Sequence, residues 1–503
     1  MSHNCEMTLS SLLMGMVELP GLPECVISGI TEDSRKVAPG YLFLAKAGLS
    51  KSGRQHIEQA IELGAAAILY EAGEQNDSGD LPVTDTVMVP VVGLEKMAGF
   101  IVSGFFGAPS ELLDIVGVTG TNGKTSCCHF LMQALGHHCA MVGTLGVGNE
   151  SNLKPTGYTT PDSVALHAFF NDWKSSGGKQ VAMEVSSHAL AQGRINGTGF
   201  FGAVFTNLSP EHLDYHHSMA SYAEQKQKLF QFSSLGFAVI NRDDPWAEKM
   251  QSALSPETAL IRYGMGEPKQ RKTETETEIW ASEVETGSKG IRFNLHVGNR
   301  NKPLKTRLIG AFNVSNLLAV SGVLHALGWP IERIIEACSR LRPVPGRMQM
   351  VPSGSSDPTV IVDYAHTPDA LENVLSELNQ QVVGRLYCVF GCGGNRDREK
   401  RPVMARIAEK YCHQVYLTDD NPRFESGELI IKDILKGFKA PRKVRVIRDR
   451  KAVIQKVVER AGADDIVLIA GKGHETGQLI EGTVLSFSDE EEVRKALRQA
   501  QPA

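Results

Sequence analysis

Residues 114–130 read DIVGVTGTNGKTSCCHF, and this stretch decides the fold of the middle of the chain. An apolar segment, 114–118, runs into a glycine-rich loop, and the residues from Lys124 onwards have the pattern of a helix. Such a strand, loop and helix point backbone N–H groups and the positive end of the helix at an anion. Lys124 adds a positive charge, and Thr125 adds a hydroxyl group that can bind Mg²⁺. We therefore expect a phosphate-binding loop in a parallel sheet of the P-loop ATPase type.

The glycines of this loop depart from the common phosphate-loop pattern. G-x-x-x-x-G-K-[ST] requires a glycine at position 118, where the chain has Val118. Gly117 lies one residue before that position and Gly120 two residues after it. The loop alone leaves the class of nucleotide enzyme open, and a P-loop NTPase that couples hydrolysis to motion or signalling stays an alternative.

Length and hydrophobic pattern predict three α/β domains. A chain of 503 residues is too long for one core. Turn-rich residues 105–111 follow a small α/β unit, and short apolar strands separated by helical stretches continue to about residue 343. The expected domains are 1–108, 109–343 and 344–503. We expect the polar segment 266–290 to be an exposed excursion or a β-hairpin.

Charge and composition exclude several classes of protein. The net charge of −5 gives no electrostatic reason to expect binding to nucleic acid or to a membrane. Nine scattered cysteines do not form a disulfide framework. The N-terminus lacks the basic region of a signal peptide, and no apolar run is long enough to span a bilayer. We expect a cytoplasmic monomer.

Four apolar strands in the last third of the chain end in polar clusters. They are TVIVDYAH (359–366), LYCVFGCGG (386–394), QVYLTDDNPR (414–423) and DIVLIAGKGHE (465–475). Ligands of open parallel sheets bind at the carboxyl ends of the strands, so these clusters predict one shared site. The order of strands and helices predicts a dinucleotide-fold-like sheet. No G-x-G-x-x-G follows its first strand, so a nicotinamide cofactor is not favoured.

Two further elements of the middle region carry candidate metal ligands. Glu184 ends the apolar strand QVAMEV (180–185), and an acid beside a phosphate loop suits Mg²⁺. The loop after strand 202–207 contains His212, Asp214 and further histidines. These residues lack zinc-site spacing, so they indicate a hard metal or a substrate.

The order of the motifs along the chain resembles the Mur ligases over nearly its whole length. The motifs are TGTNGKT (119–125), YTTPD (158–162), MEVSSHAL (183–190), NLSPEHLDYH (207–216), GAFNVSN (310–316), PGRMQ (345–349), DYAHTPDAL (363–371), GCGGNRDREKRP (391–402) and DDNPR (419–423). The resemblance implies ATP-dependent addition of meso-diaminopimelate to UDP-N-acetylmuramoyl-L-alanyl-D-glutamate through an acyl phosphate. It also implies two Mg²⁺ ions.

The resemblance assigns the residues that handle ATP and metal. It implies that Lys124, Lys226 and His212 act in catalysis, and that Lys226 is carbamylated. From the residues alone, Lys226 would be a solvated helix lysine. The implied metal ligands are Thr125, Glu184, His212 and Lys226. The implied ATP-binding residues are Gly120, Thr121, Asn122, Gly123, Lys124, Thr125, Ser126, Asn316 and Arg347.

The resemblance also assigns the two substrates of the amide bond. The implied residues for the UDP-sugar peptide are Ser34, Thr159, Thr160, Ser186, Gln192 and Arg194. Those for diaminopimelate are Arg396, Asp420, Asn421, Pro422, Arg423, Gly471 and Glu475. Asp420 and Arg423 offer opposite charges to the ammonium and carboxylate at the far end of a diamino-diacid. A sibling ligase for lysine would not need Arg423. Lysine ligation, folylpolyglutamate ligation and a silent UDP-sugar-peptide binder stay as alternatives.

Overall fold

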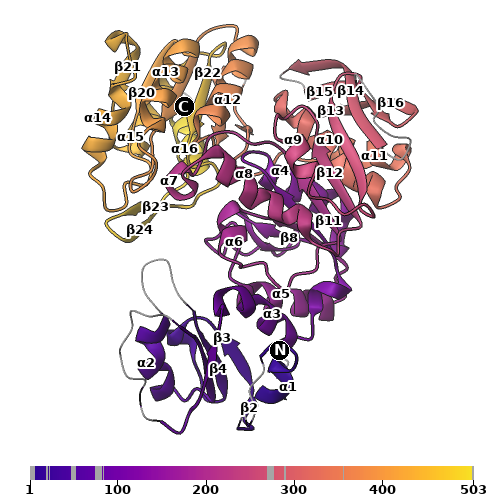
Figure 1. The fold of residues 1–503 in the computed structure, drawn as a ribbon. Helices are drawn as coiled ribbons and strands as arrows, with labels where there is room; N and C mark the ends of the chain where they lie inside the picture. The colour runs from indigo at the N-terminus through magenta and orange to yellow at the C-terminus, as the bar shows by residue number, and fades with distance from the viewer. Residues whose placement is uncertain are drawn as a thin grey trace.

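The computed structural model describes residues 6–17, 21, 23–46, 53–73, 82, 84–268, 277–287, 290–354 and 356–500. Three large sheets follow one another along the chain, each covered by helices (Figure 1). This is the three-part α/β architecture that the sequence predicts. The proposed boundaries after residues 108 and 343 stay predictions. In the described residues no helix is both long and apolar enough to cross a membrane.

The N-terminal sheet has four parallel strands in the order β3-β4-β5-β6. Leu42 and Leu44 face helices α1 and α3, while Phe43 faces α2, as the alternation of a strand requires. Its elements are β1 (Met7–Thr8), α1 (Leu9–Leu13), β2 (Val26–Ile27), β3 (Gly29–Thr31), η1 (Ser34–Lys36), β4 (Tyr41–Ala45), η2 (Gly53–His56), α2 (Ile57–Glu62), β5 (Ala67–Glu71), β6 (Val87–Val91), α3 (Leu94–Phe105) and η3 (Pro109–Leu112).

The central sheet has ten strands in the order β16-β15-β14-β13-β12-β11-β7-β10-β8-β9. From β14 to β8 neighbouring strands are parallel, and the edges are antiparallel. Its strands are β7 (Asp114–Thr119), β8 (Cys139–Gly143), β9 (Gly146–Gly148), β10 (Gln180–Glu184), β11 (Gly202–Phe205), β12 (Phe237–Asn241), β13 (Ala259–Met265), β14 (Thr277–Gly287), β15 (Gly290–Val297) and β16 (Arg300–Thr306).

Helices cover both faces of the central sheet. Val116 and Val118 of β7 pack towards α4 and α10, and Ile115 of the same strand packs towards α5 and α8. The helices are α4 (Lys124–Leu135), η4 (Gly136–His138), α5 (Ser163–Ser175), α6 (Ser187–Ala191), α7 (Leu213–His216), α8 (Met219–Gln227), η5 (Lys228–Gln231), α9 (Ala247–Gln251), α10 (Phe312–Ala326) and α11 (Ile331–Arg340).

The polar segment 266–290 contains the whole of strand β14, which pairs with β15 in antiparallel fashion. The expectation of a hairpin therefore agrees with its described part. Residues 269–276 and 288–289 lie outside the described residues.

The C-terminal sheet is a twisted parallel sheet in the order β18-β22-β19-β20-β21, with antiparallel β17 at one edge. Alternate residues of β19 pack on opposite faces, Cys388 towards α12 and α13 and Val389 towards α15 and α16. The elements are β17 (Gln349–Val351), β18 (Thr359–Asp363), α12 (Pro368–Gln381), β19 (Leu386–Phe390), α13 (Lys400–Tyr411), β20 (Gln414–Leu417), α14 (Gly427–Leu435), η6 (Pro441–Lys443), β21 (Val444–Val446), α15 (Arg450–Arg460), β22 (Ile466–Ala470), β23 (Gly477–Ile480), β24 (Thr483–Ser486) and α16 (Asp489–Ala500).

Candidate active site

A cavity of about 760 Å³ is lined by residues of both the central and the C-terminal sheets. Parallel strands β7 and β10 end at one side of it, and β18, β19, β20 and β22 end at the other. Ligands of parallel sheets bind at such carboxyl ends. The predicted site residues that line the cavity are Thr121, Asn122, Gly123, Lys124, Thr125, Ser126, Thr159, Glu184, Ser186, His212, Lys226, Asn316, Arg347, Arg396, Asp420, Asn421, Arg423, Gly471 and Glu475.

The phosphate loop lies between the end of β7 and the start of α4. Gly120 and Gly123 have positive φ angles of 149° and 88°, which side chains disfavour. A Cβ atom at Gly123 would lie 2.7 Å from Oδ1 of Asn316, so the loop can only pass α10 this closely with glycine there. Lys124 Nζ donates to the carbonyl oxygens of Gly120 and Thr121, at 2.8 and 2.7 Å. The loop thus surrounds the Lys124 ammonium group, and the first turn of α4 faces the cavity.

Thr125 and Glu184 form the part of the site best suited to a hard metal ion. The Thr125 hydroxyl donates to Glu184 Oε2 at 3.0 Å, and the Thr144 N–H donates to Oε1 at 2.8 Å. Glu184 is 1% exposed, and this burial raises its pKa against the opposing charge of Lys124. A divalent cation would favour the ionised carboxylate. In the described residues no three His, Cys, Asp or Glu side chains are grouped to hold a metal, so the fit rests on this hydroxyl and carboxylate.

Lys226 is buried against the phosphate loop. Its Nζ donates to the Gly120 carbonyl at 2.7 Å, lies 4.6 Å from the ring centre of Tyr222, and the residue is 1% exposed. Burial lowers the pKa of Lys226 well below its usual value, and the charge of Lys124 lowers it further. The interpretation of Lys226 as a solvated helix lysine is therefore wrong.

His212 stands at the start of α7 with a positive φ of 56°. Its ring lies against that of His188, with centroids 4.7 Å apart. Burial lowers the pKa of His212 to about 4, so the ring is neutral and can act as a metal ligand at physiological pH. His212 and Lys226 both line the cavity on the side of the central sheet.

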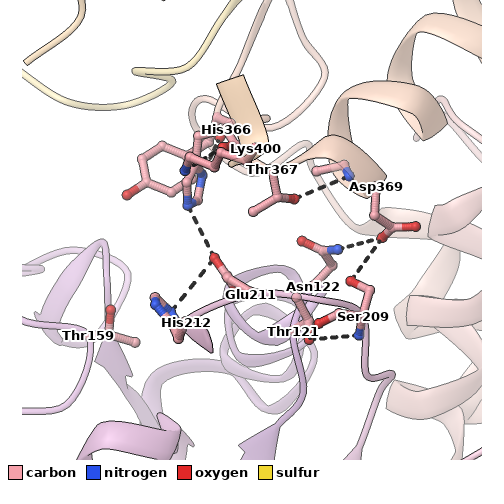
Figure 2. Close-up of polar contacts among 12 residues, drawn as sticks. Thr121, Asn122, Thr159, Ser209, Glu211, His212, His366, Thr367, Asp369 and Lys400 are labelled. Atoms are coloured by element: carbon pink, nitrogen blue, oxygen red, sulfur yellow. Dashed lines mark hydrogen bonds and ion pairs between the residues drawn. The ribbon is translucent and has the colours of Figure 1, made fainter. Parts of the chain in front are cut away.

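Contacts between the two sheets cross the cavity beside the phosphate loop (Figure 2). Glu211 Oε1 of the central domain lies 3.4 Å from His366 Nε2 of the C-terminal domain. Within the C-terminal domain, the His366 carbonyl accepts a hydrogen bond from Lys400 Nζ at 2.9 Å. Asp369, in the first turn of α12, accepts from Asn122 Nδ2 at 2.8 Å. The C-terminal domain therefore contacts the loop itself. Glu211, His366 and Asp369 are not among the predicted site residues, although all three lie in the motifs quoted above.

Glu211 keeps an acidic carboxyl group although it is largely buried between the two domains. Burial alone would raise its pKa, but the hydrogen bond from His366 and the charge of Lys124 act against burial, and the pKa of Glu211 is lowered. Its carboxylate is thus ionised and faces both sheets.

Arg347 bridges the central and C-terminal domains at the N-terminal end of helix α4. Its Nη2 donates to the Thr125 hydroxyl at 3.4 Å, and its guanidinium lies 4.2 Å from the ring centre of Tyr364. Gly346, with φ of 67°, allows the backbone to pass the loop after β22 closely. Asn316 Nδ2 donates to Asn313 Oδ1 at 3.0 Å, while Oδ1 of Asn316 lies against Gly123. Both predicted ATP contacts thus stand beside the phosphate loop.

Three of the predicted residues for the UDP-sugar peptide, Thr160, Ser186 and Arg194, contact one another outside the phosphate loop. The Thr160 hydroxyl donates to the Glu184 carbonyl at 2.8 Å, and Arg194 Nη1 donates to the Thr160 carbonyl at 3.0 Å. Gln192 Nε2 donates to Tyr215 Oη at 3.4 Å. Of this set only Thr159 and Ser186 line the cavity.

Ser34 stands apart from the other UDP residues, in η1 of the N-terminal sheet, where its hydroxyl donates to Gln59 Oε1 at 2.7 Å. The neighbouring Glu32 accepts a hydrogen bond from Ser163, at the start of α5, at 2.5 Å. This contact joins the Ser34 segment to the helix that follows Thr159 and Thr160.

The predicted acceptor residues come together from three strand ends. Asp420, Asn421 and Arg423 follow β20, Arg396 follows β19, and Gly471 and Glu475 follow β22. Asn421 Nδ2 donates to Glu475 Oε2 at 2.8 Å. Pro422 and Gly120 do not line the cavity but lie within its loops.

Lys472 belongs to the same cluster and was missed. It is fully buried, and its Nζ donates to Asn421 Oδ1 at 2.9 Å and to Glu475 Oε2 at 2.8 Å. The signal in the sequence was its place in GKGHE, directly after β22.

Comparisons with known proteins agree with this geometry. Family models described as "Mur ligase family, catalytic domain", "Mur ligase middle domain" and "Mur ligase, glutamate ligase domain" match residues 26–106, 118–324 and 346–473. A UDP-N-acetylmuramoyl-L-alanyl-D-glutamate–2,6-diaminopimelate ligase of Xanthomonas campestris pv. campestris is 46% identical over 475 residues, 94% of each chain. A ligase of the same name from Pseudomonas aeruginosa is 45% identical over 94% of this chain and 96% of its own.

Solved structures give the same picture. One of a UDP-N-acetylmuramoyl-L-alanyl-D-glutamate–2,6-diaminopimelate ligase has a TM-score of 0.68 and 34% identity, over 98% of this chain and 99% of its own. MurF from Acinetobacter baumannii shares the fold with a TM-score of 0.64 at 15% identity, over 98% of this chain and 99% of its own.

Proposed function

The chain belongs to the Mur ligase family, and we propose on that premise that it adds meso-diaminopimelate to UDP-N-acetylmuramoyl-L-alanyl-D-glutamate at the expense of ATP. The observation that carries this proposal is the shared cavity. A phosphate loop on the central sheet faces Asp420, Arg396 and Arg423 on the C-terminal sheet. A nucleotide, a carboxylate and an amine can meet there, which amide ligation requires.

The reaction has two chemical steps. An oxygen of the D-glutamyl γ-carboxylate attacks the γ-phosphorus of ATP, the bond from that phosphorus to the bridging oxygen breaks, and ADP leaves. The amine nitrogen of diaminopimelate then attacks the acyl carbon, the carbon–oxygen bond to phosphate breaks, and phosphate leaves as the amine gives up a proton. The first step needs positioning and neutralisation of charge more than covalent help from the protein.

The phosphate loop would bind and orient ATP. Lys124, now hydrogen-bonded to its own loop, can turn to the phosphates, and the N–H groups at the start of α4 point to the same place. The other proposed ATP contacts are Gly120, Thr121, Asn122, Gly123, Thr125, Ser126, Asn316 and Arg347. Arg347, which contacts Thr125 of the phosphate loop, would join the two domains over bound phosphates.

Two Mg²⁺ ions are proposed at this site. Thr125 and Glu184 would hold one, and His212 with a modified Lys226 would hold the other. Bound Mg²⁺ supplies charge neutralisation for the phosphates. The buried carboxylate of Glu184 and the neutral ring of His212 suit this role.

We propose that Lys226 is carbamylated. Its buried amine has a lowered pKa, so a neutral nitrogen is available to attack the carbon of CO₂ and lose a proton. The product is an anionic carbamate, which would replace a buried amine by a metal-facing anionic group.

The two organic substrates would bind on either side of the phosphates. Ser34, Thr159, Thr160, Ser186, Gln192 and Arg194 are proposed for the UDP-sugar peptide, and Arg396, Asp420, Asn421, Pro422, Arg423, Gly471 and Glu475 for diaminopimelate. We propose that the enzyme acts as a monomer in the cytoplasm during peptidoglycan precursor synthesis.

An acceptor panel tests the proposal. The protein is given ATP, Mg²⁺ and the UDP-linked dipeptide with meso-diaminopimelate, L-lysine, L-glutamate or no acceptor, and released phosphate and product mass are measured. We expect rapid turnover only with diaminopimelate. Equal turnover with lysine would make it a sibling ligase. Phosphate release without acceptor would favour a P-loop NTPase. If no phosphate is released with any of the acceptors, the protein would be a silent binder of the UDP-sugar peptide.

A further inference from the structure

The two arginines proposed for the acceptor stand on separate loops that must be held in register. Arg396 lies in the loop after β19 and Arg423 in the loop after β20. Each guanidinium donates a hydrogen bond to a backbone carbonyl group of the loop after β19. Arg396 Nη1 donates to the Asn395 carbonyl at 3.3 Å, and Arg423 Nη1 donates to the Gly394 carbonyl at 3.0 Å. Two like charges facing one cavity favour an anion there. Their spacing decides whether one carboxylate can reach both.

A buried ion pair lies beneath both loops. Arg401 of α13 has a side chain that is 0% exposed, and its two terminal nitrogens donate to the two oxygens of Glu425 at 2.8 Å each. Arg401 also contacts Asp433 of α14 at 3.1 Å and the Gly393 carbonyl at 3.3 Å. One side chain therefore touches the loop after β19, the end of the loop after β20, and a second helix.

Glu425 and Asn395 tie the loops to each other. The Asn395 N–H donates to Glu425 Oε2 at 3.0 Å, and the Phe424 N–H donates to Asn395 Oδ1 at 3.1 Å. Asn395 and Arg423 have positive φ angles of 52° and 56°, which non-glycine residues adopt at some cost. The bonds of this network hold both residues in that conformation.

We propose that Glu425, Arg401 and Asn395, which we call the loop clasp, are positioning residues that set the spacing of Arg396 and Arg423 and thereby the selectivity for an acceptor with a distal carboxylate. This inference rests on the proposed function. The loop clasp touches no substrate. It acts through the two arginines, which an acceptor without a distal carboxylate does not use.

The test compares two acceptors in the same protein. The ratio of kcat/KM for meso-diaminopimelate to that for L-lysine is measured in the wild type, Glu425→Gln and Asn395→Gly, with KM for ATP as a second readout. We expect the ratio to fall at least about tenfold in both variants, because a misplaced guanidinium loses a charge-assisted hydrogen bond. The efficiency with lysine and KM for ATP stay within about twofold. General damage to the domain would lower both acceptors alike.

Arg398→Ala is the matched control. Arg398 contacts the same Glu425 carboxylate at 3.1 Å from the solvent side, with a side chain that is 67% exposed, and exposed ion pairs contribute little. Its ratio should equal that of the wild type. Asn395→Gly leaves the buried ion pair intact. If Glu425→Gln does not fold, Asn395→Gly alone tests whether the loop clasp sets acceptor selectivity.

Two outcomes overturn the inference and are distinguishable. An unchanged ratio in folded Asn395→Gly, with the wild type preferring diaminopimelate, shows that the loop clasp does not set selectivity. A wild type without that preference contradicts the proposed function, and the loop clasp loses its role with it.

Discussion

At the scale of single residues, Lys226 shows that function outweighs stability in this site. A lysine amine that is 1% exposed, with a second lysine at the same carbonyl, costs free energy of folding, because the buried site disfavours the protonated form that the amine has in the unfolded chain. Nothing about packing requires a cation there, since a methionine has nearly the same length and volume. The residue therefore makes sense through its chemistry.

Lys226→Met should abolish ligase activity and raise the melting temperature. Removal of a buried amine that loses its favoured protonated form on folding is expected to add about 2–4 °C for a domain of this size. Differential scanning fluorimetry in bicarbonate-free, metal-free buffer measures this. Lys228→Met, two residues on and exposed, serves as control and should change neither quantity. A melting temperature lowered by several degrees would mean that Lys226 is structural.

Glu184→Gln should raise the Mg²⁺ concentration needed for half-maximal activity by about tenfold or more. The amide keeps the size of the side chain but removes the charge that a divalent ion would neutralise, while Thr125 and Thr144 can still hydrogen-bond to it. Phosphate release is titrated with MgCl₂ at fixed ATP. Glu224→Gln, an exposed carboxylate on α8, should leave the titration unchanged. An unaltered Mg²⁺ requirement in Glu184→Gln would remove Glu184 from the metal site.

Sequence reasoning reaches Lys124, Thr125 and Glu184 because local spacing from a strand end places each of them. It does not reach Lys472 or Asp369. Asp369 and its partner Asn122 are 247 residues apart, so their contact exists only once two domains are docked. The role of Lys472 likewise depends on a distant residue, because its partner Asn421 lies 51 residues away in the loop after β20.

At the scale of elements, helix α5 carries a buried histidine that makes the stability of the central domain depend on pH. His167 is 0% exposed, its ring lies edge-on to Phe170 with centroids 5.8 Å apart, and burial lowers its pKa to about 4. In the unfolded chain the pKa is about 6.5. Between these values the unfolded chain binds more protons than the folded one. The contribution of neutral, buried His167 to the free energy of unfolding is therefore complete above pH 6.5 and is lost as the pH falls towards 4.

His167→Gln should remove this dependence. The wild-type free energy of unfolding should fall relative to the variant by as much as about 3 kcal/mol from pH 7 to pH 4, since the variant has no imidazole to protonate. Urea unfolding at stepped pH measures the difference, and Trp173 on the same helix gives a fluorescence signal from that domain. Parallel curves for the two proteins would show that the ring is protonated without penalty.

Elements with strong periodicity follow from the sequence, and those fixed by long-range pairing do not. The buried strands that end at 363, 390, 417 and 470 are confirmed. The hairpin β23–β24 was not anticipated, although Glu481 and Gly482 at its turn have the two positive φ angles of a tight hairpin turn. The hairpin is stabilised by a long-range contact, because Ile480 forms a β-bridge to Arg423 and so supports the loop after β20.

At the scale of the whole molecule, the chain order of the three sheets follows from the sequence, and their docking does not. Figure 1 shows the N-terminal sheet below the central one and the C-terminal domain beside it. Polar contacts that cross the cavity include Glu211 with His366, and Asn122 and Ser209 with Asp369. Interfaces of this kind permit relative motion of domains. A reaction with three substrates then needs the domains to close around them.

Asp369→Ala should loosen the ligand-free protein without unfolding it. The carboxylate holds α12 to Asn122 at 2.8 Å and to Ser209 at 3.5 Å, so its removal deletes two of the bonds between the C-terminal domain and the phosphate loop. We expect a larger radius of gyration by X-ray scattering in the absence of nucleotide, and a higher KM for ATP. Glu372→Ala, one turn along the same helix, pairs with Lys410 inside the domain and should change neither.

Ligands should reverse the effect. With an ATP analogue and both substrates bound, contacts to three ligands outweigh one lost carboxylate, so the scattering curves of Asp369→Ala and the wild type should superimpose on a more compact form. If wild-type curves with and without ligands coincide, the domains do not close. If only the variant fails to become compact, Asp369 is needed to complete closure as well as to hold the ligand-free arrangement.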